Sequence, residues 1–340
     1  MAGGHRFFLV GDVGATNARL AIATRADGRI EWIHEGREAD ANFPTFEAAI
    51  DALFARSSVG RGELAAACFG VAGPIQGRRA RFTNRDWVID ADALETKLGA
   101  PVRLVNDLEA AAAGVDGLPR SDFAVLQKGS TRSDGVRLVI GAGTGLGVAY
   151  AVPCGGAYRT MASEGGHAGF APQNARQRRL LDALADGDRR VDAEYIVSGA
   201  GLERIYAILR AAHPARETPA MRAELDLGPR AAAIGSFALE RADPLASEAL
   251  DLFIDCYGSV AGDHALAVLP YGGVFVVGGI AAKILPRLAE GGFVRAFVAK
   301  GEFAALAKSF SIAVVTNERL GLVGATLLAS EPEADARRSR

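Results

Sequence analysis

The chain has 340 residues, of which 49% are hydrophobic and 23% charged, with 41 glycines. This composition is typical of a folded α/β protein with room for two cores, and it excludes a disordered or fibrous chain. The net charge of −2 gives no electrostatic footprint for nucleic acid. No apolar run approaches the ~20 residues of a membrane span, and the first residues lack a signal-peptide pattern. We therefore expect a cytoplasmic protein with neither nucleic-acid nor membrane partners.

The first informative segment is FFLVGDVGATNARLAIA at residues 7–23. It predicts a strand at Phe7–Val10, a glycine-rich bend beginning at Gly11, and a second strand at Arg19–Thr24. The ADGR sequence at 26–29 then predicts a tight turn into a third strand at 30–34. Glycines in such a bend let a backbone turn sharply or approach a ligand closely.

Helices and strands alternate through the rest of the chain. The expected elements are a helix at Thr45–Ala55, a strand at Ala65–Val71, a helix at Asp90–Leu98 closed by Gly99, a strand at Val102–Val105 and a helix at Leu108–Ala113. The pattern then starts again with RLVIGAGTGLGVAYAV at 137–152, and GGVFVVGGIAAKILPRL at 272–288 reads as strand, paired glycines and helix. Further helices are expected at 176–186, 200–212, 230–241, 245–269 and roughly 319–330. Because one strand–loop–strand unit occurs twice, the sequence predicts a duplicated α/β core.

The two glycine loops match neither of two familiar phosphate motifs. No Gly-Lys pair occurs in the chain, which excludes a P-loop, and both loops lead into β-prone sequence rather than into a helix, which excludes a dinucleotide fingerprint. Hairpin tips of this kind expose backbone N–H groups that can form concave nests for anions. We therefore expect the loops to hold the phosphates of a nucleotide.

Seven motifs in this order carry a resemblance to a known family: GDVGATNAR, GPIQGRRARFTNRDW, LVNDLEA, GAGTGLGVA, EGGHAGFAP, EYIVSGAGL and VFVVGGI. From about residue 6 to about residue 328 the chain resembles the bacterial glucokinase family of the sugar kinase/Hsp70/actin superfamily. Ala15 stands where that family usually has a second glycine. The chain lacks the Cys-rich zinc motif of the related ROK-type sugar kinases, since Cys68, Cys154 and Cys256 have no zinc-site spacing. We expect a zinc-free member with all three thiols in the core.

The resemblance implies an α/β, two-lobed actin-like ATPase fold, a duplicated ribonuclease H-like fold with the active site in the cleft between the lobes. The smaller lobe is expected to comprise residues 1–115 and about 318–332, the larger lobe 116–317, and 333–340 a disordered tail. The implied reaction is ATP-dependent phosphorylation of D-glucose to glucose 6-phosphate, with ATP and Mg²⁺ as cofactors. A homodimer is the expected assembly.

The candidate sugar site contains carboxylates, an amide and an imidazole. Asn106 and Asp107 end a predicted strand, where ligands of α/β folds bind, and a carboxylate there can accept a hydroxyl proton during phosphoryl transfer. Asp107 is therefore the candidate catalytic base, although an Asp at this place can also cap the following helix. Glu164 and His167 flank a glycine pair that would let the backbone approach a ligand. The resemblance makes both of them sugar ligands, together with Asn106 and Glu194.

The candidate nucleotide site consists of the two loops and a later glycine pair. Its residues are Gly11, Asp12, Val13, Gly14, Ala15 and Thr16, then Gly141, Gly143, Thr144 and Gly145, and finally Gly278 and Gly279 against the adenosine. Asp12 is also the expected Mg²⁺ residue. His5, His34, His213 and His264 are expected to be surface or structural residues.

Three alternatives remain open from the sequence. The first is a kinase for another hexose, such as mannose or fructose. The second is a sugar-responsive regulator, which no helix-turn-helix segment before residue 7 supports. The third is an actin- or Hsp70-like ATPase, which would not need Glu164, His167 and Glu194.

Overall fold

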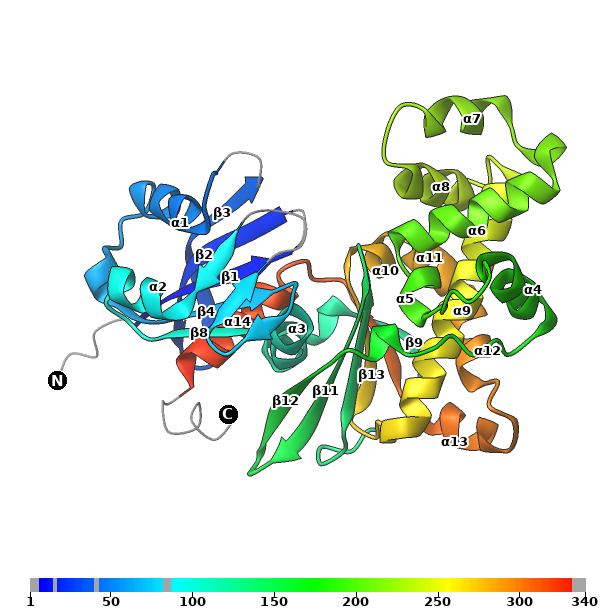
Figure 1. Ribbon diagram of the computed structural model, residues 1–340. Helices are drawn as coiled ribbons and strands as arrows, with labels where there is room; N and C mark the ends of the chain where they lie inside the picture. Colours follow the sequence, from blue (N-terminus) through cyan, green and yellow to red (C-terminus); the bar gives the residue numbers. More distant parts are fainter. Residues whose placement is uncertain (1–5, 15–16, 40–42, 82–86, 332–340) are drawn as a thin grey trace. The chain divides into compact units, whose positions relative to one another are not determined.

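The computed structural model describes residues 6–14, 17–39, 43–81 and 87–331. Ala15, Thr16 and the expected tail at 333–340 lie outside these ranges. The chain divides into two compact units, one made of Met1–Arg120, Tyr158–Ala162 and Asn317–Arg340 and the other of Ser121–Ala157 and Ser163–Thr316. Each unit contains one large sheet (Figure 1) and its own hydrophobic core. The segment Tyr158–Ala162 belongs to a strand of the second sheet, which is described below with the second unit.

The first unit is built on a five-stranded sheet with the order β3-β2-β1-β4-β8. Strands β1, β2 and β3 form an antiparallel meander, and β4 and β8 run parallel to β1. The bounds are β1 Phe7–Val13, β2 Asn17–Ala26, β3 Arg29–Ala39, β4 Leu64–Val71 and β8 Val102–Asn106. A small three-stranded sheet accompanies it, with β5 Ile75–Gln76, β6 Arg79–Arg81 and β7 Val88–Asp90.

Helices cover both faces of this sheet. Successive strand residues point to opposite faces, so Leu9 belongs to the cluster that contains α1 and α2 residues, and Phe8 and Val10 belong to the cluster that contains α3 and α14 residues. The C-terminal helix α14 therefore packs on the sheet that opens the chain. The bounds are α1 Phe46–Ala55, α2 Ala91–Leu98, α3 Asp107–Gly114 and α14 Leu320–Ser330.

The second unit repeats the topology of the first. Its six-stranded sheet has the order β12-β11-β10-β13-β14-β9, whose first five strands match β3-β2-β1-β4-β8 in order, and β13 and β14 again run parallel to the first strand of the hairpin. The duplicated α/β core predicted from the repeated pattern is confirmed. The bounds are β9 Phe123–Gln127, β10 Arg137–Ala142, β11 Leu146–Cys154, β12 Ala157–Ser163, β13 Gly273–Val277 and β14 Ile312–Val315.

A long buried helix, α9, organises the helical part of the second unit. This helix (yellow in Figure 1) contacts α6, α8 and α12. Its Phe253 and Tyr257 are fully buried, and the ring of Tyr257 lies against Phe293 of α12. The bounds are α4 Ala175–Leu184, α5 Ala193–Ile196, α6 Gly199–Ala212, α7 Pro219–Leu225, α8 Arg230–Leu239, α9 Pro244–Val268, α10 Gly279–Lys283, α11 Leu285–Leu288, α12 Gly292–Val298 and α13 Ala304–Ser309.

Two local predictions are confirmed by backbone conformation. Asp27 and Gly28 have φ angles of 52° and 76° between β2 and β3, as the two central residues of a type I′ hairpin turn require. Gly99, with φ 67°, closes α2 in the left-handed conformation, in which glycine carries no steric penalty.

Three other predictions are wrong. Strand β1 continues to Val13 instead of ending before Gly11, because β2 and β4 pair with it along its whole length. Strand β10 likewise contains Gly141 and ends at Ala142, so the second bend is shorter than the glycine run. Cys154 is exposed, because it ends β11 just before a turn through Gly155 and Gly156.

Candidate active site

Three candidate residues of the first unit lie at one edge of its sheet. Asp12 is paired with Gly70 of β4, and Asn106 is paired with Val71, the next residue of the same strand. A Cβ on Gly70 would lie only 2.9 Å from the Cβ of Ala110 in α3. The missing side chain thus lets α3 pack close to β4, and Asp107 begins α3 at the carboxyl edge of the sheet, where ligands of α/β folds bind.

Asp107 is the first residue of α3, and the cap of this helix is its neighbour. The Oδ1 of Asn106 accepts a hydrogen bond of 2.9 Å from the backbone N–H of Leu108, and the Oδ1 of Asp107 lies 2.8 Å from the same nitrogen. The capping role considered for Asp107 therefore belongs to Asn106. The half-buried Asp107 carboxylate sits in the first helical turn, where the helix dipole stabilises negative charge.

Asp12 is a half-buried carboxylate at the end of β1. Burial raises the pKa of Asp12, and the positive charge of Arg19 opposes this effect. The side chain packs against the first turn of α14, where a Cβ on Gly321 would lie 2.7 Å from the Oδ2 of Asp12. Within the part of the chain that the structure describes, no group of three or more His, Cys, Asp or Glu residues gathers to hold a metal ion. A lone carboxylate still fits Mg²⁺ that is held mainly by phosphates and water.

The second glycine loop is a closed hairpin fixed to a helix. The N–H of Gly143 donates to the carbonyl of Gly145 at 2.8 Å, and the carbonyl of Gly143 accepts from the N–H of Gly199 at 2.9 Å. Gly199 is the first residue of α6, whose N-cap is Ser198. The exposed Thr144 occupies the tip. The loop is therefore held in one conformation by backbone bonds on both sides.

The structure brings Glu194 and His167 together beside this loop. The Oε2 of Glu194 accepts a hydrogen bond of 2.8 Å from the N–H of Leu146, the first residue of β11. The Oε1 of Glu194 lies 4.0 Å from the Nδ1 of His167. A Cβ on Gly145 would overlap the Glu194 carboxylate. The lack of a side chain at Gly145 thus leaves room for the carboxylate of a candidate sugar ligand.

Glu164 opens the short 3-10 helix of Gly165–His167, and its carbonyl accepts a bond of 3.0 Å from the N–H of His167. Protein atoms occupy the space beside both glycines of the pair that Glu164 and His167 flank. A Cβ on Gly165 would lie 2.7 Å from the Cε1 of His264, and a Cβ on Gly166 would overlap the carbonyl of Leu146. The turn that carries Glu164 and His167 therefore packs against β11 and α9.

Sequence reasoning missed two residues around His167. Asp192, which caps α5, places its Oδ2 4.0 Å from the Nδ1 of His167, and the Nη2 of Arg190 donates to the carbonyl of His167 at 2.9 Å. Arg190 belongs to a short DRR run that reads as a solvated surface segment. Only its position just before the DAEYI segment hinted at this contact.

The third segment of the candidate nucleotide site, the pair Gly278 and Gly279, lies at the carboxyl end of β13. Gly278, with φ 91°, occupies the N-cap position of α10, and a Cβ there would lie 2.8 Å from the carbonyl oxygen of Ala142 in β10. Gly279 faces open space. The second loop and the third glycine pair thus follow two neighbouring strands of one sheet.

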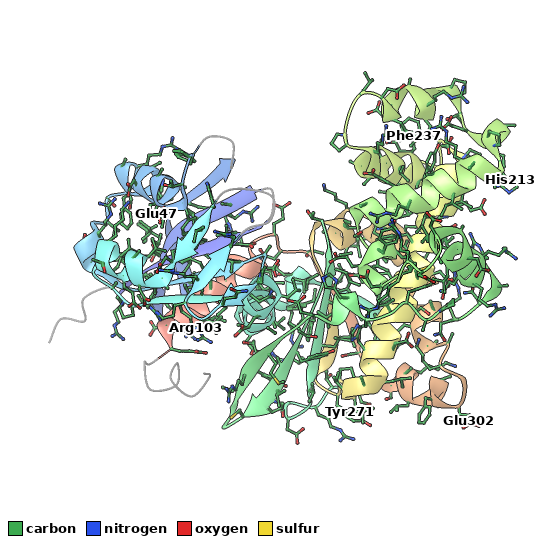
Figure 2. The ribbon with its side chains drawn as sticks, viewed as in Figure 1. Glu47, Arg103, His213, Phe237, Tyr271 and Glu302 are labelled. Carbon is green, nitrogen blue, oxygen red and sulfur yellow. The ribbon has the colours of Figure 1, made fainter. Side chains whose placement is uncertain are left out.

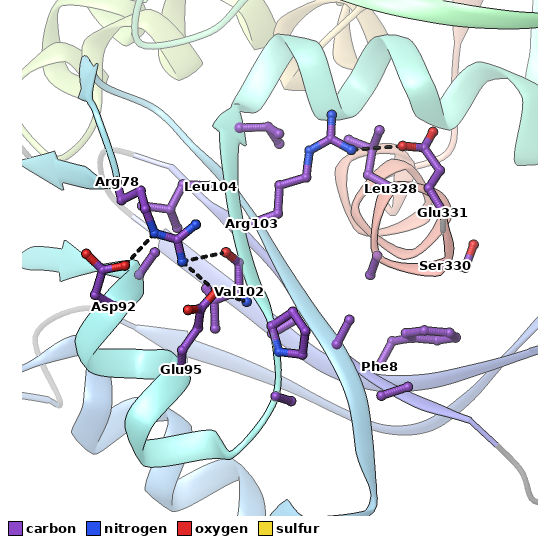
Figure 3. A pocket seen from close by; sticks show the side chains of 18 of the residues that line it. Phe8, Arg78, Asp92, Glu95, Val102, Arg103, Leu104, Leu328, Ser330 and Glu331 are labelled. Carbon is purple, nitrogen blue, oxygen red and sulfur yellow. Dashed lines mark hydrogen bonds and ion pairs between the residues drawn. The ribbon is translucent and has the colours of Figure 1, made fainter. Parts of the chain in front are cut away.

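A pocket of about 1280 Å³ in the first unit (Figure 3) contains none of the candidate residues. Two arginines that line it are paired with carboxylates. Arg78 is bonded to Asp92 and Glu95, and Arg103 is bonded to Glu331 at 2.8 Å. The carboxylates of these pairs also line the pocket, so these two guanidinium charges are matched there.

Among the described histidines outside the candidate set, His264 packs against Gly165 in the turn that carries Glu164 and His167. His213 is exposed at the end of α6 (Figure 2). Burial raises the pKa of Cys68 to about 12 and raises that of Cys256 as well, so both thiols are inert core residues. None of the helices in the described ranges is long and apolar enough to cross a membrane.

The chain is similar to known proteins over most of its length. The Glucokinase family model matches residues 9–332. The chain belongs to the glucokinase family. It is 37% identical over 338 residues to the glucokinase of Nostoc punctiforme, covering 95% of this chain and 98% of that protein. The crystal structure of a glucokinase from an Antarctic psychrotroph superposes with a TM-score of 0.80 at 28% identity, covering 95% of this chain and 98% of that one.

The ROK branch of glucokinases is more distant. A ROK family glucokinase from Streptomyces griseus, solved in complex with glucose and AMPPNP, has a TM-score of 0.64 at 23% identity, covering 95% of this chain and 99% of that one. This likeness extends to the fold alone. The recognition of the chain as a non-ROK glucokinase and the prediction of its actin-like fold are confirmed.

Proposed function

We propose that the chain transfers the γ-phosphoryl group of ATP to the 6-hydroxyl of glucose through the residues described above. The observation that carries this proposal is the bond between Glu194 and the N–H of Leu146, with His167 4.0 Å from the same carboxylate. It puts polar groups suited to sugar hydroxyls at the base of a phosphate-type glycine loop. A bare ATPase has no need for this arrangement.

Asp107 is assigned as the base that accepts the proton of the attacking hydroxyl. Its place at the carboxyl edge of the sheet supports this role, as does its place in the first helical turn, where the helix dipole favours negative charge. Phosphoryl transfer needs positioning and charge neutralisation more than strong basicity. Asn106, Glu164, His167 and Glu194 are assigned to the sugar hydroxyls, each of which both donates and accepts hydrogen bonds.

The glycine segments are assigned to the nucleotide. Gly143, Thr144 and Gly145 would bind phosphate oxygens, and Gly278 and Gly279 would lie against the adenosine. Gly11 and Gly141 would contribute indirectly, since a side chain at either position would displace strand neighbours. Asp12 would hold Mg²⁺, which neutralises phosphate charge when bound. Val13, Gly14, Ala15 and Thr16 complete the assignment for the first loop.

The assembly and location are part of the same proposal. We assign the protein to the cytoplasm and expect a homodimer, in line with the sequence-based expectation. Light scattering coupled to size-exclusion chromatography measures the mass in solution. A mass of one chain at micromolar concentration would contradict the dimer.

A coupled assay across hexoses and phosphoryl donors tests the proposed reaction. We expect turnover with glucose and ATP that requires Mg²⁺, and a lower kcat/KM with mannose and fructose, whose hydroxyls or ring forms differ from those of glucose. A higher kcat/KM with either of these sugars would make the chain a kinase for that hexose. ATP hydrolysis that no sugar stimulates would favour the ATPase alternative.

A further inference from the structure

Two polar side chains of α9 reach toward the candidate loops of the second unit. Tyr257 and His264 are seven residues apart on this helix, which corresponds to two turns and places them on the same helix face. Neither residue belongs to the catalytic or binding set. Tyr257 bonds to the backbone of β10, which leads into the second glycine loop, and His264 bonds to the hydroxyl of Tyr150 in β11.

Tyr257 holds the strand that leads into the second glycine loop. Its hydroxyl accepts a bond of 3.1 Å from the N–H of Ala142 and donates one of 3.2 Å to the carbonyl of Ile140. Ala142 is the last residue of β10, and β13 pairs with β10 no further than Gly141. The tyrosine hydroxyl therefore binds backbone groups of β10 where its pairing with β13 ends, immediately before Gly143.

The position of the Tyr257 ring is fixed by its surroundings. The side chain is fully buried, and edge-on contacts with Phe253 and Phe293 have centroid distances of 6.0 and 5.3 Å. Burial raises the pKa of Tyr257, so the hydroxyl keeps the proton that it donates. A buried ring in one orientation can set the position of a backbone segment.

His264 supports the turn that carries Glu164 and His167. Its Nδ1 lies 3.1 Å from the hydroxyl of Tyr150 in β11, and it makes a hydrogen bond to the backbone of Gly165. The ring also fills the space that a side chain at Gly165 would need. This imidazole therefore packs directly against Gly165, in the turn that carries Glu164 and His167.

We propose that this face of α9 positions two substrate-binding segments separately. Tyr257 fixes the position of the nucleotide loop at Gly143–Gly145, and His264 fixes the position of the sugar turn, which carries Glu164 and His167. The inference rests on the proposed function, which assigns Gly143–Gly145 to phosphate and Glu164 and His167 to glucose. Tyr257 and His264 are positioning residues, since each acts through a backbone segment. One helix thereby supports both substrates through different side chains.

The test for Tyr257 is steady-state kinetics of Tyr257→Phe, which removes the hydroxyl and keeps the ring. We expect KM for ATP to rise about three- to tenfold, the order of one or two lost hydrogen bonds, with KM for glucose within twofold of wild type. The matched control is Tyr206→Phe, because Tyr206 is also buried and loses a hydroxyl bond, to Glu217 at 3.1 Å, away from both loops. The control should lower the melting temperature without changing either KM.

The test for His264 is the reciprocal experiment. His264→Leu removes both polar contacts, and we expect KM for glucose to rise about three- to tenfold while KM for ATP changes less than twofold. His264→Gln retains an amide that can reach the backbone of Gly165, so it should restore part of the glucose affinity. A purely structural role would lower stability and move both KM values together.

A raised KM for ATP only in Tyr257→Phe and a raised KM for glucose only in His264→Leu would support the inference. An unchanged KM for ATP in Tyr257→Phe, or parallel shifts of both KM values in either variant, would overturn it.

Two further variants separate failure of the inference from failure of the proposed function. If Thr144→Ala leaves ATP binding unchanged and Glu164→Ala leaves glucose binding unchanged, the loop assignments themselves fail. If those two variants behave as assigned while the α9 variants are silent, only the positioning roles fail.

Discussion

The two glycine hairpins of this molecule share a backbone plan and differ in the residue that follows the first glycine. Side chains of neighbouring strands crowd both glycines. A Cβ on Gly11 of β1 would lie 2.7 Å from the side chain of Phe69, and a Cβ on Gly141 of β10 would lie 2.7 Å from the side chain of Val277. The next residue is the half-buried carboxylate Asp12 in one hairpin and the buried Ala142 in the other.

The first hairpin therefore offers a carboxylate to a ligand, whereas the second offers only backbone groups and the Thr144 hydroxyl. The first hairpin carries a charge that faces the first turn of α14, and the same sheet edge carries Asp107. The second hairpin carries no charge of its own, and its backbone is held by Tyr257, Glu194 and α6. The two hairpins thus share a strand framework, while the first carries a carboxylate of its own and the second is held by hydrogen bonds from residues outside the loop.

The largest expected effect comes from the first unit, with Asp107→Asn. Removing the proposed base while keeping its shape should lower kcat at least about 100-fold, within the range of general-base catalysis, and change glucose affinity much less. Stopped-flow or coupled assays give kcat, and calorimetry gives the affinity. Asp90→Asn is the control, because Asp90 is a capping aspartate of the same unit and Asn caps equally well. Activity of Asp107→Asn within a few-fold of wild type would remove it from the base role.

The second prediction concerns the sugar set of the second unit. Glu164→Ala and His167→Ala should each weaken glucose binding by roughly 1–3 kcal/mol, since bound hydroxyls would lose their partners. Binding of a non-hydrolysable ATP analogue should change little. Calorimetric titration with each ligand measures both. Unchanged glucose affinity in both variants would mean that this turn is structural.

The third prediction compares two glycines of one loop. Gly145→Ala puts a methyl group where the Glu194 carboxylate lies, whereas Gly143→Ala points into open space. We expect Gly145→Ala to displace Glu194 from the N–H of Leu146 and to raise KM for glucose about fivefold, the order of one charge-assisted bond. Gly143→Ala should leave KM for glucose unchanged. Equal values for the two variants would show that Glu194 is not held for sugar binding.

The smallest expected effect is on stability and depends on pH. Burial lowers the pKa of His264, while its bond to Gly165 and the charge of Asp263 oppose this. Below about pH 6.5 the unfolded chain binds a proton that the folded imidazole resists, so the free energy of unfolding should fall as pH decreases through that value. In urea titrations, the free energy of unfolding should fall less between pH 7.5 and pH 5.5 for His264→Gln than for wild type. His213→Gln, at an exposed position, should behave as wild type does.

Local signals predicted local structure well. The type I′ turn at Asp27–Gly28 and the cap at Gly99 depend on backbone conformations that a few adjacent residues determine. The strand ends were predicted less well, because β1 and β10 extend as far as their neighbours pair with them. Pairing partners that are distant in the sequence leave no local mark.

The candidate site shows the same division. The sequence placed Asn106 and Asp107 at a strand end because both the strand and the helix are local features. It did not reveal that the glycines at 165 and 166 make room for His264 and Leu146. His264 lies almost 100 residues further along the chain, and nothing around it in the sequence points to the turn that it supports.

The exposed Cys154 has a practical consequence for biophysical work. The other two thiols are buried, so a maleimide dye should couple to the natural protein at this one position without engineering. Donor- and acceptor-labelled batches can then be mixed, and energy transfer between them would report subunit exchange in a homodimer. A chain that remains single would give no transfer at any concentration, and a reporter at the β11–β12 turn leaves every candidate residue untouched.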